Sequence, residues 1–199
     1  MFQKSAAAAA LLLLVAAPTV AQTPPRRIRG TIDEVAGNAL TIKTDGGSDT
    51  TILLTAKTRI DTFVQKSLAD VKPGDFLAST GIRGKDGKIH AIEVRILPHP
   101  AANGGRQFPW DLGADSVMTN ATVGTVTKAP AGEEVHVTWK GGQSQYSIGP
   151  GVPVLAPISG SRSLLKPGAA VFAVASVAPD GHLTALFMYV ESNGIKPPL

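Results

Sequence analysis

Two stretches of this chain repeat one pattern: VKPGDFLASTGIRGKDGKIHAIEVRI at residues 71–96 and LKPGAAVFAVASVAPDGHLTALFMYV at residues 165–190. The second begins 94 residues after the first (165 − 71 = 94). The copies share a Lys-Pro-Gly turn, an Asp-Gly pair and an alanine at positions 91 and 185. Proline and glycine set turns and apolar residues fill cores, so the repeated feature is a structural unit rather than a set of reacting groups.

The residues around the first copy predict a small barrel from residue 28 to residue 98. Apolar residues alternate in ALTIKT (39–44) and in IHAIEVRI (89–96), and this alternation is typical of strands with one buried face. Asp86 and Gly87 predict a hairpin turn before the last strand. A short helical turn precedes the Lys-Pro-Gly motif. Five strands with a short helix between the third and the fourth are the layout of an OB-type barrel.

A second unit, residues 119–192, follows the same plan. At an offset of 94 residues, Gly124 matches Gly30 and Val126 matches Ile32, and the offset becomes 95 in the second strand. Apolar residues replace apolar residues at the matched positions. The sequence therefore predicts an all-β protein of two tandem, five-stranded OB-like barrels, joined by an ordered linker.

That linker is the segment HPAANGGRQFPWDLGADSVM, residues 99–118. Its proline and glycine residues are typical of a linker, but Phe108 and Trp110 are poor material for a disordered tether. We expect the segment to dock across a barrel surface as a clamp. Direct stacking of Trp110 on a ligand is the alternative.

The two copies differ on the outer face of their last strand. The first copy has Glu93 and Arg95 there, and the second has Phe187 and Tyr189. An outer face that becomes aromatic predicts a partner. The rings either pack against the other barrel or the linker, or they form a contact surface for a ligand or a protein. Trp110, Phe187 and Tyr189 are therefore the candidate binding residues.

The N-terminus predicts a secretory signal peptide at residues 1–21. Lys4 precedes an apolar run of 12 residues, 6–17, and small residues lead to a cleavage site after Ala21. A membrane-spanning helix needs about 20 apolar residues, and no later segment approaches that length. We expect an exported protein, periplasmic or secreted, that does not span the membrane.

Composition and motifs argue against several classes of function. Acidic and basic residues are interspersed at a formal net charge of +4, without the basic stripe that nucleic-acid binding requires. The chain has no cysteine, which excludes disulfides, thiol catalysis and thiolate metal sites. None of the four histidines lies in an HExxH motif, and no GxSxG or phosphate-binding loop is present. We therefore expect neither an enzyme nor a cofactor.

A metal site is the weaker alternative. His99, Asp111, Asp115 and Met118 lie within 20 residues of one another and would converge if the linker folded back. Without a repeated ligand spacing, solvated linker residues are the competing interpretation. This set is the basis of an alternative function, a periplasmic metal-handling accessory protein.

Several motifs resemble a known family. GTIDEVAGNALTIKTDGG (30–47), SLADVKPGDFLAST (67–80) and the A-x-x-V strand at Ala91–Val94 are similar to a bacterial exported family of OB-like domains of unknown function. PWDLGADSVMTNATV (109–123) further resembles its proteobacterial tandem-repeat subgroup. The resemblance implies a periplasmic location and two barrels, and it carries over no activity. We expect a non-enzymatic binding or assembly module of the cell envelope, whose partner is an envelope protein or a small ligand.

Overall fold

The structure, a computed structural model, describes residues 23–130 and 132–197, so the predicted signal peptide lies outside the described residues. The described chain is all-β, as the alternation predicts. In this part of the chain no helix has the length and apolar character needed to cross a membrane. The elements are β1 (Arg26–Ala36), β2 (Ala39–Thr44), β3 (Asp49–Leu53), β4 (Arg59–Lys66), η1 (Leu68–Asp70), β5 (Phe76–Arg83), β6 (Ile89–Leu97), β7 (Arg106–Pro109), β8 (Ser116–Ala129), β9 (Gly132–Trp139), β10 (Gly142–Ile148), β11 (Val154–Ser159), η2 (Arg162–Leu164), β12 (Ala170–Val177) and β13 (Leu183–Val190).

Strands from both ends of the chain close one five-stranded barrel, which we call ring A. Its order is β1-β2-β3-β13-β12, and β12 pairs back to β1. Only the β3–β13 pairing is parallel. The buried core comes from the inward side of each strand and includes Ile28, Ile32, Leu40, Ile42, Ile52, Val171, Ala173 and Met188.

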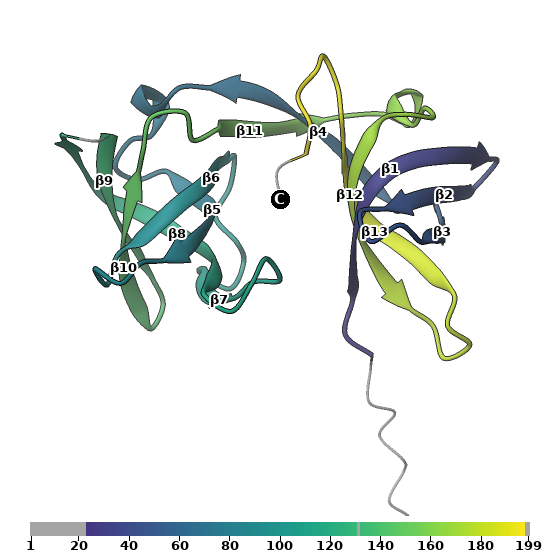
Figure 1. Cartoon of the computed structure of the whole chain (residues 1–199), viewed down its shortest axis with the longest axis horizontal. Coiled ribbons are helices and arrows are strands. Elements are labelled where there is room, and N and C mark those ends of the chain that lie inside the picture. Colours follow the sequence, from purple (N-terminus) through teal and green to yellow (C-terminus); the bar gives the residue numbers. More distant parts are fainter. Residues whose placement is uncertain (1–22, 131, 198–199) are drawn as a thin grey trace, which may run out of the picture.

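The middle of the chain closes a second ring of five strands, ring B. Its order is β8-β9-β10-β6-β5, and β5 pairs back to β8. The parallel pairing here is β10–β6. Its core is separate from that of ring A and includes Leu77, Ile89, Val94, Val123, Val135, Val137, Tyr146 and Ile148. Figure 1 shows the two rings as separate lobes, joined across the top by β4 and β11.

The two rings do not coincide with the predicted units 28–98 and 119–192. Each ring combines three strands of one unit with two strands of the other. The reason lies in β4 and β11, which do not fold back onto their own unit. They run antiparallel to each other from Asp61–Ser159 to Lys66–Val154 and carry the chain into the opposite ring (Figure 1). The last two strands of each unit are thereby exchanged.

The exchange follows an approximate twofold relation between the units. Phe63 and Pro157 lie 94 residues apart and pair directly in the β4–β11 ladder. Corresponding strands of the two units occupy equivalent positions in the two rings. The last hairpin of each unit also has a bulge at the equivalent place, between Thr80 and Gly81 and between Val174 and Ala175.

The first strands correspond at a different offset from the predicted one. Phe76 pairs with Thr122, and the equivalent Ala170 pairs with Thr31, so the offset in this strand is 91 (122 − 31). Ile32 therefore matches buried Val123 rather than Val126, which corrects the alignment. The β8–β9 hairpin is longer and absorbs the difference, and bulges follow both matched residues.

Candidate binding cleft between the two rings

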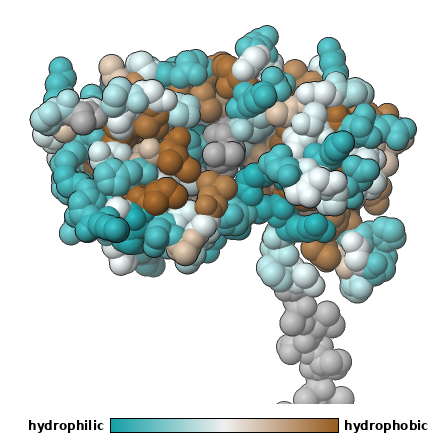
Figure 2. All heavy atoms as spheres, viewed as in Figure 1, coloured by the Kyte–Doolittle hydropathy of each residue, from teal (hydrophilic) through white to brown (hydrophobic). Residues whose placement is uncertain are grey.

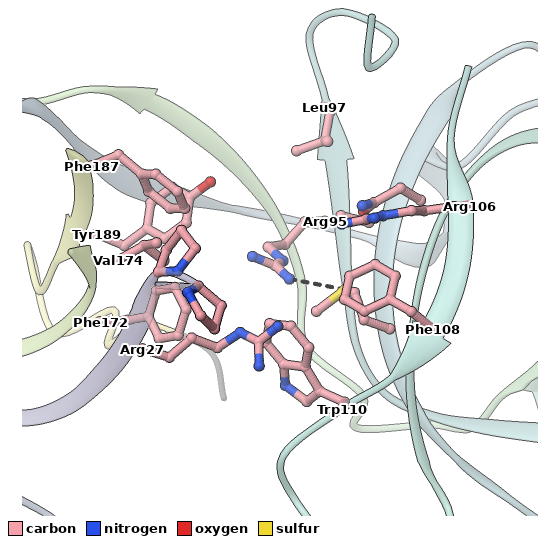
Figure 3. Close-up of a pocket in the computed structure, with 15 residues that line it drawn as sticks. Arg27, Arg95, Leu97, Arg106, Phe108, Trp110, Phe172, Val174, Phe187 and Tyr189 are labelled. Carbon is pink, nitrogen blue, oxygen red and sulfur yellow. Dashed lines mark hydrogen bonds between the residues drawn. The ribbon is translucent and has the colours of Figure 1, made fainter. Parts of the chain in front are cut away.

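A cleft of about 500 Å³ lies between ring A and ring B. This volume is within the range of small-molecule sites. Figure 3 shows aromatic side chains on the ring A side and arginine and aromatic side chains on the ring B side. In the view of Figure 2, a patch of hydrophobic atoms interrupts the hydrophilic surface of the lobe formed by ring B, near the boundary with ring A. The cleft is lined by Pro24, Pro25, Arg27, Ala78, Arg95, Leu97, Arg106, Phe108, Trp110, Met118, Asn120, Phe172, Val174, Phe187 and Tyr189.

The ring A wall is aromatic. Met188 of β13 is fully buried in the ring A core, so alternation places its neighbours Phe187 and Tyr189 on the outer side of the barrel. Phe172 of β12 lies beside them, with its ring centroid 6.2 Å from that of Tyr189. Phe63 of β4 closes the cluster at 4.6 Å from Tyr189. The outer face of this hairpin is therefore a continuous aromatic surface.

The ring B wall is the equivalent surface of the other unit. Arg95 occupies the position of Tyr189, and Ala78 occupies that of Phe172, each at the offset of 94 residues. The outer faces of the β5–β6 and β12–β13 hairpins face each other across the cleft. The guanidinium carbon of Arg95 lies 6.0 Å from the Tyr189 ring centroid. The duplication has thus produced two facing walls, one aromatic and one charged.

Glu93 and Arg95 lie on the outer face of ring B but are buried, with 2% and 8% of their surfaces exposed. Arg95 Nη2 lies 2.9 Å from Glu93 Oε1, and Thr80 Oγ1 donates a hydrogen bond to the same oxygen at 2.7 Å. Burial raises the pKa of Glu93, against the opposing effects of Arg95 and Thr80. Among the described residues, Arg95 Nε and Glu93 Oε2 are buried without a hydrogen-bond partner.

The predicted linker, residues 99–118, does not join the two rings, because it connects β6 to β8 and both strands belong to ring B. It is docked on a barrel surface, as expected, and completes the ring B wall. Its strand β7 pairs with β8. Gly105, with φ of +87°, lets the chain enter β7, since a Cβ there would lie 2.2 Å from the Asn120 carbonyl oxygen. Phe108 and Trp110 then lie against each other with ring centroids 5.9 Å apart. The guanidinium carbon of Arg106 lies 4.5 Å from the Phe108 ring centroid.

Trp110 and Asp111 hold the linker against β1 of ring A. The guanidinium carbon of Arg27 lies 4.1 Å from the Trp110 ring centroid. Arg29 donates two hydrogen bonds to the Asp111 carboxylate, at 3.0 and 2.8 Å. Partial burial favours a higher pKa for Asp111, but the hydrogen bonds and charge of Arg29, helped by Arg27, hold that pKa below its ordinary range. Asp111 therefore serves as a clamp between the rings.

The structure brings the three candidate binding residues together, since Trp110, Phe187 and Tyr189 all line the cleft. Sequence reasoning did not nominate Phe172 and Phe108 as binding residues, nor the three lining arginines. Arg95 could have been found through the repeat, because it occupies the position of Tyr189. The sequence does not identify Arg27 and Arg106 as binding residues. Each looks like an ordinary surface cation, and only the arrangement of the two rings places both at the cleft.

The proposed metal ligands do not converge. Asp111 is bound by two arginines, and Met118 is buried, with its sulfur 3.5 Å from Arg95 Nη2. His99 lines a separate cavity beside β4 and β11, while the backbone carbonyl of Asp115 accepts a hydrogen bond from the Arg83 amide. Within residues 23–130 and 132–197, no three His, Cys, Asp or Glu side chains are grouped to hold a metal ion.

No family model, curated protein or solved structure matches this chain. The resemblance to the exported OB-like family therefore rests on the quoted motifs, and the functional argument rests on the cleft.

Proposed function

We propose that the protein is an exported, non-enzymatic binding module of the cell envelope, and that its ligand site is the cleft between the rings. The observation that carries the proposal is the gathering of aromatic residues. The chain has two Trp, two Tyr and six Phe, and five of these ten rings line this one cleft. Aromatic side chains that line a concave site supply most of the contact area in small-molecule binding.

The strand order supports an OB-like assignment for both rings. Each unit has six strands rather than the predicted five, because β4 or β11 follows the first three. With β4 and β11 left out and the other five strands numbered within each unit, each ring has the order 1-2-3-5-4, and its parallel pairing joins the third and the fifth of these strands. This is the Greek-key order of an OB barrel, in which a short helix follows the third strand. We infer that the two units are OB-like barrels that exchange their last two strands, with η1 and η2 in the place of the helix.

Replacing Phe187 with Ser is expected to weaken binding of the neutral dye N-phenyl-1-naphthylamine about fivefold to tenfold. The ring of Phe187 is half-buried and faces the cleft, so its loss removes stacking worth about 1 kcal/mol. The free energy of unfolding should fall by only about 1–2 kcal/mol, because a half-buried ring contributes less than a fully buried one. Dye fluorescence titration and urea unfolding measure the two effects.

The matched control is Leu186→Ser in the same strand. Leu186 is exposed and does not line the cleft, so this variant should bind the dye like the parent protein. If Phe187→Ser loses about 3 kcal/mol or more of stability while dye binding is unchanged, the aromatic wall is a structural seam and the proposed function is wrong.

Export is tested by the mature N-terminus. When the full-length chain is produced in a Gram-negative host, the periplasmic protein is expected to begin at Gln22, because a small-residue site ends at Ala21. Intact-mass spectrometry identifies the first residue directly. The variant Ala21→Leu removes the small residue at the cleavage position and should leave the precursor uncleaved. Parent protein that retains Met1 in the cytoplasm would contradict the export proposal.

A further inference from the structure

All the charged side chains that line the cleft are positive. Three arginines, Arg27, Arg95 and Arg106, belong to the lining, and the lining includes no acidic residue among those that the structure describes. The carboxylates of Glu93 and Asp111 lie behind two of these arginines and pair with them. Arg106 has no ion-pair partner in the described part of the chain. The cleft therefore offers aromatic surface and guanidinium groups to an occupant.

Two hydrogen-bond donors that lack a partner in the described part of the chain also favour a ligand with oxygen acceptors. Arg95 is more than nine-tenths buried, and Figure 3 shows its guanidinium group extending from ring B into the space between the walls. Its Nε atom and the indole Nε1 of Trp110 are buried and have no hydrogen-bond partner among the described residues. Buried donors are normally paired in folded proteins, and an unpaired one costs about 1–3 kcal/mol. The guanidinium group that carries one of these atoms faces the space between the walls, where oxygen acceptors of a ligand would supply hydrogen bonds that the protein does not.

We propose that the cleft binds an organic anion, in which a carboxylate, sulfonate or phosphate group is attached to a flat apolar body. This inference rests on the proposed function of the cleft as a binding site. Guanidinium groups match the oxygen geometry of these anions, and Arg95 and Arg106 approach the cleft from the ring B side. The flat body lies against the Phe172–Phe187–Tyr189 wall, where aromatic faces favour stacking.

The test uses two dyes that share one ring system. N-phenyl-1-naphthylamine is neutral, and 8-anilino-1-naphthalenesulfonate carries a sulfonate on the same framework. In fluorescence titrations of the parent protein, the sulfonate dye is expected to bind at least about tenfold tighter, the effect of one charge-assisted hydrogen bond. Equal affinities would overturn the anion proposal and leave the proposed function intact. If neither dye binds, the proposed function itself fails.

Two variants locate the anion. Arg106→Gln should weaken the sulfonate dye several-fold, and the double variant Glu93→Gln/Arg95→Met, which removes the buried pair together, should weaken it about tenfold. The quantity compared is the ratio of the two dye affinities, which should fall in both variants, because a change in cleft shape affects both dyes whereas the loss of a guanidinium group acts mainly on the sulfonate dye. Lys85→Gln is the charge-matched control, because Lys85 is exposed in the β5–β6 turn and away from the cleft lining. Unchanged sulfonate affinity in both cleft variants would overturn the proposal.

Competition separates a flat body from an acyl chain. Naphthalene-1-sulfonate should displace the bound sulfonate dye at a lower concentration than decanoate does, because only the former can stack on the aromatic wall of ring A. The reverse order would overturn the flat body and assign the cleft to acyl chains.

Discussion

Cysteines introduced at Thr31 and Ala170 are expected to form an intramolecular disulfide that raises the free energy of unfolding by up to about 5 kcal/mol. The two residues are direct partners in the β1–β12 ladder, although 139 residues separate them in the chain (170 − 31). The cross-link closes a very long loop of the unfolded chain, which is where the loop-entropy model gives the largest gain. The parent chain has no cysteine, so no other pairing competes.

The same double variant in its reduced form is the matched control, since it differs only in the bond. Thiol titration measures bond formation, and urea unfolding of the oxidised and reduced forms measures the gain. In a tandem arrangement, β1 would pair with β5, and the cysteines at 31 and 170 would lie in different barrels. Two free thiols after oxidation, or only disulfide-linked dimers, would contradict the exchanged topology.

Replacing Arg95 with Met is expected to lower the free energy of unfolding at pH 7 by about 3 kcal/mol. The substitution preserves the length of the side chain but leaves Glu93 buried without its counter-charge, and breaking a buried pair on one side costs about 3–5 kcal/mol. The double variant Glu93→Gln/Arg95→Met should recover most of the loss, because no buried charge remains. Urea unfolding of the two variants measures both effects, and equal stabilities would show that the pair is not coupled.

The pH dependence of stability has a definite sign. The pKa of Glu93 is raised in the folded protein, so the folded state holds this proton more tightly than the unfolded chain does. The contribution of Glu93 to stability is therefore complete below the ordinary glutamate pKa and is lost as the pH rises through the raised value. Arg95→Met should extend this dependence to higher pH, because the carboxylate loses its cation and its pKa in the folded protein rises further. In the double variant the contribution of residue 93 should vanish.

Local patterns predicted most of the strands and turns, but not the additional strands β4, β7 and β11. Asp86 and Gly87 lie between β5 and β6, and the short helical turn before the Lys-Pro-Gly motif is η1. Each of these features depends on neighbouring residues only. The internal repeat also identified which strands correspond, apart from the shift in the first strand.

The choice of partner could not be predicted in the same way. β5 and β12 are alternative partners for β1, and both have the same alternating pattern because the two hairpins are copies of each other. Only the path of β4 and β11 decides between them. The charged wall shows the same limit: Glu93 and Arg95 were expected on an outer face, and there they are buried, in contact with Thr80 of β5 and Met118 of β8. Burial by residues that are distant in the sequence cannot be predicted from a local pattern.

The path of the chain also sets an order of assembly during synthesis. All five strands of ring B lie between Phe76 and Ile148, so this ring is complete once that continuous stretch has emerged. Ring A must wait for its last strand, which ends at Val190. Until then β1 has no partner at its β12 edge, and the aromatic wall of the cleft does not exist. The aromatic wall can therefore form only after the chain has emerged as far as Val190.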